Sequence, residues 1–207
     1  MAKLLIVALE YLEPEWQQTL NCIEATGLPY QIVRRDGIGN MSRAFNTVFN
    51  NPFLDYDLLW LVTNIIFEPN IPHLLAQGIG DYAAIHPAMK SSDHRFQWPD
   101  GSKEVKQVPF VEFTAPMIRT EVLYNNPLDE MLPYYYMDLD FAHRIKPEKV
   151  AVHHGAEINH VYLRNKQTEH PISTIRKRLR HYWTPLSQAH MRKKWGADWE
   201  TKLWPKK

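Results

Sequence analysis

Residues 3–9 read KLLIVAL, and this stretch decides the fold. Six consecutive apolar side chains follow Lys3 without any alternation of polar and apolar positions. That pattern is typical of a strand buried on both faces, as in the centre of a parallel sheet. Pro14 then stands where the first turn of a helix tolerates proline, and apolar residues from Trp16 onward recur at helical spacing until Gly27. Residues 3–27 therefore predict a strand, a loop and a helix.

Strands and helices continue to alternate along the chain. Further strands are expected at 30–33, 57–63, 82–85 and 149–152, and helices are expected to begin at Ser42, around residues 74–75, near 118–123 and over 138–145. This order indicates an α/β fold with a mostly parallel sheet and helices on both sides. Residues 87–107 interrupt the pattern because they are polar and rich in Ser, Asp, Gly and Pro. A loop of that length in a compact domain is usually functional or disordered.

Length and charge suggest one domain with a distinct tail. A chain of 207 residues with 44% hydrophobic content can bury one substantial core. Residues 1–160 hold 12 basic and 20 acidic residues, whereas 161–207 hold 12 and 3. We therefore expect a domain over 1–162 and a basic helical tail over 163–207 that packs on it. The lone Cys22 and the short apolar runs favour a cytoplasmic protein without stable membrane insertion.

The segment 134–144, YYYMDLDFAHR, is the most informative for chemistry. Asp138 and Asp140 stand two residues apart at the start of a predicted helix, near its positive end. A carboxylate held there is well placed to act as a general base toward an acceptor hydroxyl. The alternative is that Asp138 caps the helix and Asp140 is an ordinary first-turn acid.

Three stretches together resemble the inverting family 2 glycosyltransferases, which include the rhamnosyl- and glucosyltransferases of bacteria and phages. They are FTAPMIRTEVL (113–123), PLDE (127–130) and YYMDLDFAHR (135–144), and their order and spacing match the family's small-residue, "mirr-vf", "fDe" and "yyeDvDl--R" elements. The resemblance implies a GT-A fold and inverting transfer from a nucleotide-sugar, with Asp138 as the catalytic base. Met137 replaces the family's usual Glu.

The resemblance also predicts the diphosphate and metal site. His160 ends a stretch, 149–160, that is similar to the family's closing strand, where such a histidine contacts the metal or the donor diphosphate. A buried structural histidine is the alternative. The family's DxD triplet corresponds here to Val62, Thr63 and Asn64, so an amide replaces the decisive aspartate. An amide brings no charge to offset dehydration of a hard cation, and we expect Asn64 and His160 to hold Mn²⁺ or Mg²⁺ weakly or not at all.

Other residues are expected at the donor because they follow strand ends, where parallel α/β folds bind ligands. The segment 39–46, GNMSRAFN, is similar to the family's "gn-g-a-aN-g" loop and helix, and Arg43 could pair with a phosphate. No GxxxxGK or GxGxxG motif occurs, which argues against an NTPase or a dinucleotide enzyme. The predicted donor-binding residues are Glu10, Asp36, Asn40, Arg43, Asn46, Thr63, Asn64 and His160.

The composition of the tail is compatible with more than one kind of acceptor. Its segment 175–183, IRKRLRHYW, interleaves basic and aromatic residues, and Arg176, Arg178, Arg180 and Trp183 are candidates for binding an acceptor or a polyanion. An anionic membrane surface would suit it as well, and so would packing of a basic helix on the domain. We expect a uridine-based nucleotide-sugar donor and either a glycan intermediate or a hydroxymethylated base in phage DNA as acceptor. A catalytically decayed module that binds nucleotide-sugars or polyanions is the alternative.

Overall fold

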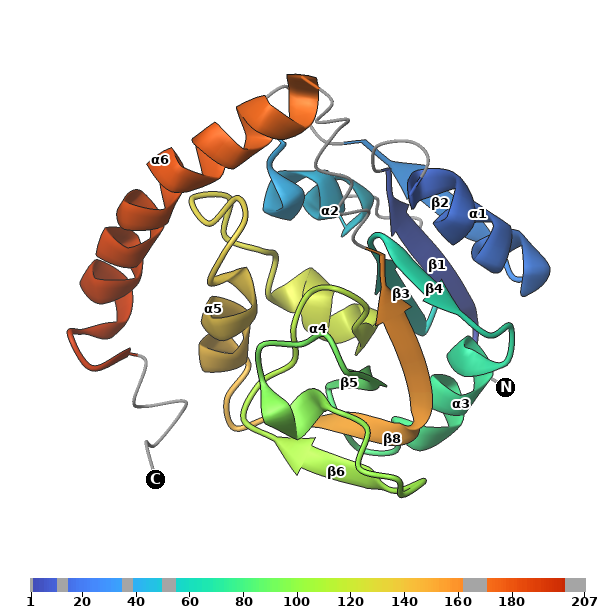
Figure 1. Ribbon diagram of the computed structural model, residues 1–207. Coiled ribbons are helices and arrows are strands. Elements are labelled where there is room, and N and C mark those ends of the chain that lie inside the picture. The colour runs from blue at the N-terminus through green and yellow to red at the C-terminus, as the bar shows by residue number, and fades with distance from the viewer. Residues whose placement is uncertain (1, 11–14, 35–38, 50–54, 162–170, 200–207) are drawn as a thin grey trace.

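The computed structural model describes residues 2–10, 15–34, 39–49, 55–161 and 171–199, and of Phe49 and residues 171–180 it describes the backbone alone. Figure 1 shows that the strands form one central sheet and that helices lie around it. The elements follow in the order β1 (Leu4–Leu9), α1 (Glu15–Ala25), β2 (Tyr30–Val33), α2 (Met41–Phe49), β3 (Leu58–Val62), β4 (Ile65–Phe67), α3 (Ile71–Gly78), β5 (Ala84–Met89), η1 (Arg95–Gln97), β6 (Val105–Val108), β7 (Met117–Arg119), α4 (Thr120–Asn125), α5 (Met137–Arg144), β8 (Val150–His160) and α6 (Pro171–Trp195).

The sheet is mixed. Its strand order is β2-β1-β3-β7-β5-β8-β4, and β6 pairs with β8 beside this path. The pairs β1/β2, β1/β3 and β5/β8 are parallel. Strand β7 lies antiparallel between β3 and β5, and β4 and β6 lie antiparallel to β8. The α/β class is as expected, but the sheet is not mostly parallel, because short strands missed by periodicity run against their neighbours.

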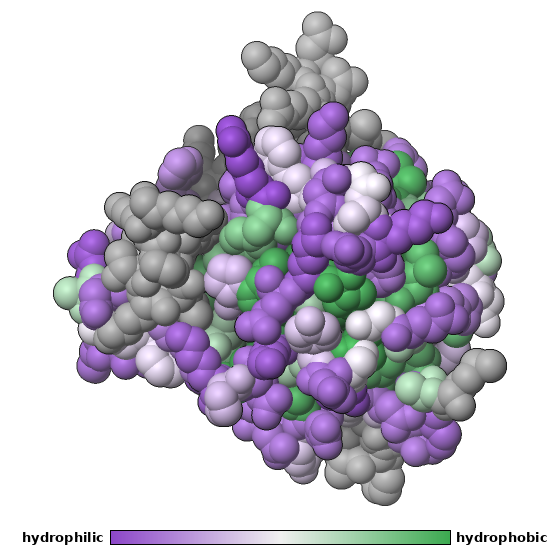
Figure 2. Space-filling model, turned by 90° about the horizontal axis from the view of Figure 1, so that it is seen from below, coloured by the Kyte–Doolittle hydropathy of each residue, from purple (hydrophilic) through white to green (hydrophobic). Residues whose placement is uncertain are grey.

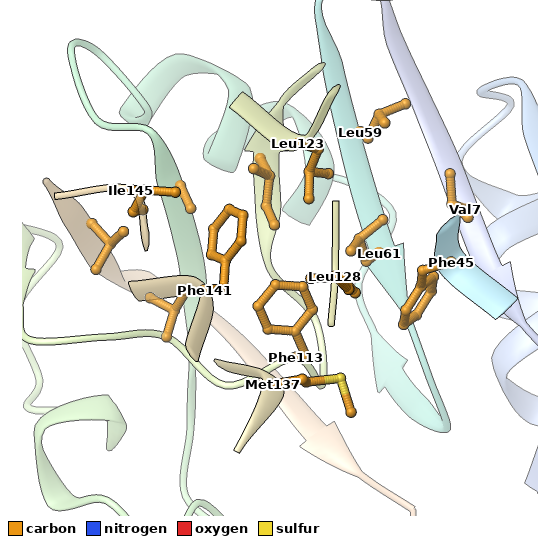
Figure 3. Close-up of a cluster of buried hydrophobic side chains, with 14 of the residues drawn as sticks. Val7, Phe45, Leu59, Leu61, Phe113, Leu123, Leu128, Met137, Phe141 and Ile145 are labelled. Atoms are coloured by element: carbon orange, nitrogen blue, oxygen red, sulfur yellow. The ribbon is translucent and has the colours of Figure 1, made fainter. Parts of the chain in front are cut away.

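Each face of the sheet has its own core. Side chains alternate across β1, so Leu5, Val7 and Leu9 face one cluster and Leu4, Ile6 and Ala8 face the other. The first cluster packs against α2, α4 and α5 through Phe45, Leu123 and Phe141 (Figure 3). The second packs against α1 and α3, with Trp16, Ile23 and Leu75 buried there. All six residues of β1 are buried, which explains its unbroken apolar run.

The region after β5 is more ordered than its composition suggests. Strand β5 extends through Met89, η1 follows, and β6 pairs with β8 from Val105 to Val108. A compact loop lies between β5 and β6, and its Ser92 and Gln97 are buried. This loop reaches the candidate site described below.

The C-terminal helix α6 runs along the outside of α5 (Figure 1). Its Met191 and the following Trp199 are buried in the same cluster as Phe141. The face seen in Figure 2 is mostly hydrophilic, with hydrophobic residues in smaller groups between the polar ones. Among the described residues, no helix combines the length and the apolar character that crossing a bilayer requires.

Candidate active site

A cavity of ≈ 260 Å³ lies where β3 and β8 end and α5 begins. Its wall is formed by segments far apart in the chain, so polar side chains distant in sequence meet there. The lining residues are Met41, Thr63, Asn64, Asp93, His94, Glu112, Phe113, Thr114, Tyr134, Tyr135, Tyr136, Met137, Asp138 and His160.

Asp138 lines this cavity from the first turn of α5. The helix starts abruptly because Tyr136, its N-cap residue, adopts a left-handed conformation with φ 69°. The Asp138 side chain accepts a hydrogen bond from the backbone N–H of Leu139 at 2.9 Å. Burial raises the pKa of Asp138 to about 6, against which the backbone hydrogen bonds act. A carboxylate with such a pKa is a better proton acceptor near neutral pH than an ordinary aspartate.

Met137 occupies the position at which the family's pattern has Glu. Its side chain is 3% exposed and belongs to the core around Phe141 (Figure 3). Its sulfur accepts a hydrogen bond from the Ser42 hydroxyl at 3.7 Å. The acidic pair of the family pattern is thus replaced by one carboxylate and one core residue.

Two further carboxylates, on Glu112 and Asp93, share the cavity with Asp138 and were not expected from the sequence. The pKa of Glu112 is raised to about 7, mainly by burial and also by the charges of Asp138 and Asp93, while a hydrogen bond from Ser92 lowers it. The sequence does hold a signal for Glu112. It is the lone charged residue in the run VPFVEFTAP, 108–116, and a carboxylate among apolar neighbours is a candidate for a special role.

Asn64 and His160 are brought together as predicted for one site. The Oδ1 of Asn64 and the Nε2 of His160 are 3.0 Å apart, and the Asn64 amide donates to the Val161 carbonyl at 2.7 Å. Thr63 lies beside them, and its hydroxyl donates to the Thr114 carbonyl at 3.0 Å. These groups are neutral or weakly basic and offer hydrogen bonds more than charge.

A hard divalent cation does not fit this donor set. Within the described part of the chain, no group of three or more His, Cys, Asp and Glu side chains is arranged to hold a metal. The Asn64 amide is fixed by its bonds to Val161 and His160, so its oxygen is already engaged. Mn²⁺ and Mg²⁺ prefer charged oxygen ligands, which Asn64 and His160 do not supply.

Asp140 does not line the cavity, and its position favours a structural role in place of the catalytic one expected. Its side chain is fully buried, with Oδ2 2.7 Å from the Arg144 Nε. Its Oδ1 accepts from the Trp195 indole at 2.8 Å and lies 2.8 Å from the Lys194 ammonium. The carboxylate thus joins α5 to the end of α6. Stacking of His143 on Trp195, with ring centroids 4.8 Å apart, supports the same junction.

Of the donor-binding residues predicted before β3, those that the structure describes do not line the cavity. Asn40 and Asn46 hold α2 against the segment before α5, through hydrogen bonds to the backbone of Glu130 and Leu128. Arg43 pairs with the Glu130 carboxylate at 2.8 Å. Glu10 pairs with Arg34 at 3.1 Å. Asp36 lies outside the described residues.

The predicted polyanion-binding residues of the tail also lie apart from the cavity lining, as far as they are described. Trp183 is partly buried on α6, with its ring 5.7 Å from that of Tyr182. The side chains of Arg176, Arg178 and Arg180 are outside the described part of the structure. The later part of α6 contacts the domain through Lys194 and His190, which both bind the Asp129 carboxylate at 2.8 Å.

The chain is similar to known proteins in fold but not in sequence. No protein-family model matches the chain, and no curated protein matches it. Solved structures do match. A197 from STIV is 14% identical with a TM-score of 0.56, over 78% of this chain and 86% of that one.

Two solved glycosyltransferases are also similar. GalNAc-T7, with UDP, GalNAc and Mn²⁺, gives a TM-score of 0.58 at 9% identity over 95% of this chain, which spans 51% of that one. A mutant Drosophila beta-1,4-galactosyltransferase 7, with manganese, UDP-Gal and xylobiose, gives 0.53 at 11% identity, over 84% of this chain and 79% of that one. At these identities the likeness shows the fold alone. It confirms the expected α/β class with GT-A-like neighbours.

Proposed function

We propose that this chain transfers a sugar from a nucleotide-sugar donor to an acceptor hydroxyl. The observation that carries the proposal is the position of Asp138, a carboxylate with a raised pKa on the wall of a cavity where β3 and β8 end. The fold supports it, because the similar GalNAc-T7 and beta-1,4-galactosyltransferase 7 structures hold UDP and UDP-Gal respectively. A uridine-based donor is therefore the first to test.

In the proposed reaction Asp138 accepts the proton of the acceptor hydroxyl. The acceptor oxygen forms a bond to the anomeric carbon while the bond from that carbon to the diphosphate breaks. The electron pair of the broken bond leaves with the nucleoside diphosphate. A single displacement of this kind inverts the configuration at the anomeric carbon, as the resemblance in the sequence implies.

The donor diphosphate is proposed to lie by Thr63, Asn64 and His160. The Asn64 amide nitrogen uses one hydrogen for the Val161 carbonyl, and its second hydrogen can donate to the charge that develops on the leaving group. Arg43 was expected to assist, but its pairing with Glu130 outside the cavity lining favours a structural role. The similar structures contain Mn²⁺ or manganese. Because Asn64 and His160 are a poor donor set for such a cation, we propose weak or absent metal dependence, and no step above uses one.

A catalytically decayed binding module is the second candidate. The amide at Asn64 favours it, since the family pattern has a carboxylate there. Such a module would bind the donor without releasing the nucleotide from it. Measuring donor hydrolysis separately from donor binding distinguishes the two candidates.

Screening nucleotide-sugars for thermal stabilisation, with and without Mn²⁺, tests the donor assignment. A true donor at about 100 times its Kd stabilises the fold by about 2.7 kcal/mol through mass action. We expect a uridine-based nucleotide-sugar to raise Tm, and free UDP to raise it less. If no nucleotide-sugar shifts Tm, the assignment fails.

A further inference from the structure

Glu112 is held on the cavity wall by two buried polar residues. The Ser92 hydroxyl accepts a hydrogen bond from the His94 backbone N–H at 2.9 Å and lies 3.4 Å from the Gln97 amide nitrogen. Its own proton therefore points to the Glu112 carboxylate, whose Oε1 is 2.6 Å away. The Gln97 side-chain oxygen accepts from the Glu112 backbone N–H at 3.3 Å. Ser92 and Gln97 are 4% and 0% exposed, so this support is rigid.

The charge of the cavity discriminates between acceptors. Among its described lining residues, three are carboxylates and none is lysine or arginine. The donor diphosphate is proposed to lie by Thr63, Asn64 and His160, so the carboxylates are left to face the acceptor. A phosphate group of the acceptor brought beside Asp93, Glu112 and Asp138 would be repelled, since like charges at short range disfavour binding. Neutral hydroxyl groups are instead attracted, because a carboxylate accepts charge-assisted hydrogen bonds from O–H donors.

Aromatic side chains complete this wall. Tyr134, Tyr135, Tyr136 and Phe113 line the cavity together with the carboxylates. Tyr135 is 45% exposed, which leaves it accessible to a ligand. Tyr136 is anchored, because its hydroxyl accepts a hydrogen bond from Gln188 of α6 at 2.8 Å. Tyrosine combines an apolar ring with a polar tip, which suits a ligand with both C–H faces and hydroxyl groups.

We infer that Glu112 positions the acceptor by accepting a hydrogen bond from a second acceptor hydroxyl, and that the acceptor is an uncharged saccharide. This inference rests on the proposed function. Asp138 takes the proton of the reacting hydroxyl, while Glu112, supported by Ser92, fixes the orientation of the acceptor ring. Glu112 is thus a positioning residue and Asp138 the catalytic one.

The test measures acceptor binding and transfer separately in the full chain. The probes are a panel of neutral p-nitrophenyl glycosides and a DNA duplex that contains 5-hydroxymethylcytosine. The variants are Glu112→Gln, Ser92→Ala, which leaves the carboxylate but removes its support, and the control Glu104→Gln. Glu104 lies outside the cavity lining and pairs with Lys106 at 3.4 Å.

We expect a glycoside to bind in the presence of UDP, observed by ligand NMR, and Glu112→Gln to weaken its binding about tenfold or more, as for loss of a charge-assisted hydrogen bond. Ser92→Ala should weaken it less, and Glu104→Gln should not change it. In transfer assays the loss should appear in KM for the acceptor more than in kcat. Unaltered glycoside affinity in Glu112→Gln, or binding of the DNA in preference to every glycoside, overturns the inference. Failure of the proposed function looks different, since the wild-type chain would then neither bind nor hydrolyse any nucleotide-sugar.

Discussion

The Oδ1 of Asn64 lies 3.0 Å from the Nε2 of His160, a contact that joins two residues 96 positions apart. It places the end of β3 against the end of β8, where β4 also pairs. The Asn64 amide nitrogen donates to the Val161 carbonyl at 2.7 Å, so both ends of the side-chain amide are used. The position that the sequence resemblance aligns with a metal-binding aspartate is therefore a hydrogen-bonded junction in this chain.

Replacing Asn64 by Asp should restore metal binding at a cost in stability. The carboxylate cannot donate to the Val161 carbonyl, which should cost about 1–3 kcal/mol in EDTA because a buried acceptor loses its partner. A charged oxygen beside His160 is a better ligand for Mn²⁺. Thermal melting should therefore show that Mn²⁺ raises Tm more for Asn64→Asp than for the wild type. Asn159→Asp, the same change at an exposed position on β8, is the control. An equal response to Mn²⁺ in wild type and Asn64→Asp would contradict this prediction.

The partly buried carboxyl groups of Asp138 and Glu112 should make stability depend on pH. The pKa is about 6 for Asp138 and about 7 for Glu112, both raised by burial. In the unfolded chain these values are about 4, so the folded protein binds more protons between about pH 4 and pH 7. The stabilisation that each protonated group gives is fully present below pH 4 and is lost as the pH rises through the folded pKa.

Asp138→Asn and Glu112→Gln should therefore stabilise the fold at pH 8, each by on the order of 1–3 kcal/mol, and change it little at pH 4. Urea unfolding at the two pH values measures this difference. Glu104→Gln, at an exposed carboxylate, should show no such pH dependence. Equal changes in unfolding free energy at pH 4 and pH 8 would argue against ionised, buried carboxylates in the cavity.

The attachment of α6 should depend on Lys194. Its ammonium group binds Asp129 and Asp140, each at 2.8 Å. Burial alone would raise the pKa of Asp129, but hydrogen bonds from Lys194 and His190 hold it at about 2. Lys194→Ala should thus cost about 1–3 kcal/mol in urea unfolding, since it leaves the fully buried Asp140 with one cation fewer.

The adjacent exposed residue gives a matched control for the tail. Lys193→Ala should change stability by less than about 0.5 kcal/mol, as surface substitutions usually do. Limited proteolysis of both variants shows whether α6 is released. Equal stability and equal protection in the two variants would mean that Lys194 does not hold the tail.

Much of the fold follows from local sequence patterns. The buried strand β1, the helix α1 after Pro14 and the helix α5 after the tyrosine run were predicted within a few residues. The strands β4 and β6 were missed, because stretches of three or four residues are too short to show a clear periodicity. The apolar pattern predicted a strand over 149–152 only, whereas the resemblance to a closing strand covered 149–160, and β8 runs from Val150 to His160. Strand β7 was missed as well, because a helix was expected near 118–123, whereas Met117–Arg119 form a strand and the helix begins at Thr120.

The residues of the candidate site were likewise predicted only in part from the sequence. Asp138, Asn64 and His160 were found through motif order, and the structure brings all three to one cavity. Asp93 reaches that cavity from the loop after β5, and Glu112 reaches it from the segment between β6 and β7; no local pattern specifies how these segments fold together. The role of Asp140 depends on Trp195, 55 residues away, so spacing alone could not separate it from Asp138. Long-range contacts decide which of two similar carboxylates can meet a ligand.

Transfer by wild-type chain and by Asp138→Asn, followed as UDP release from the stabilising donor, tests the central claim most directly. The isosteric change keeps the cavity shape, and Asp81→Asn, at an exposed carboxylate outside this cavity, is the control. We expect Asp138→Asn to lower kcat by about 10²–10⁴, as for loss of a general base, while the donor Kd stays within about threefold. An Asp138→Asn chain that releases UDP at more than about a tenth of the wild-type rate would contradict the account.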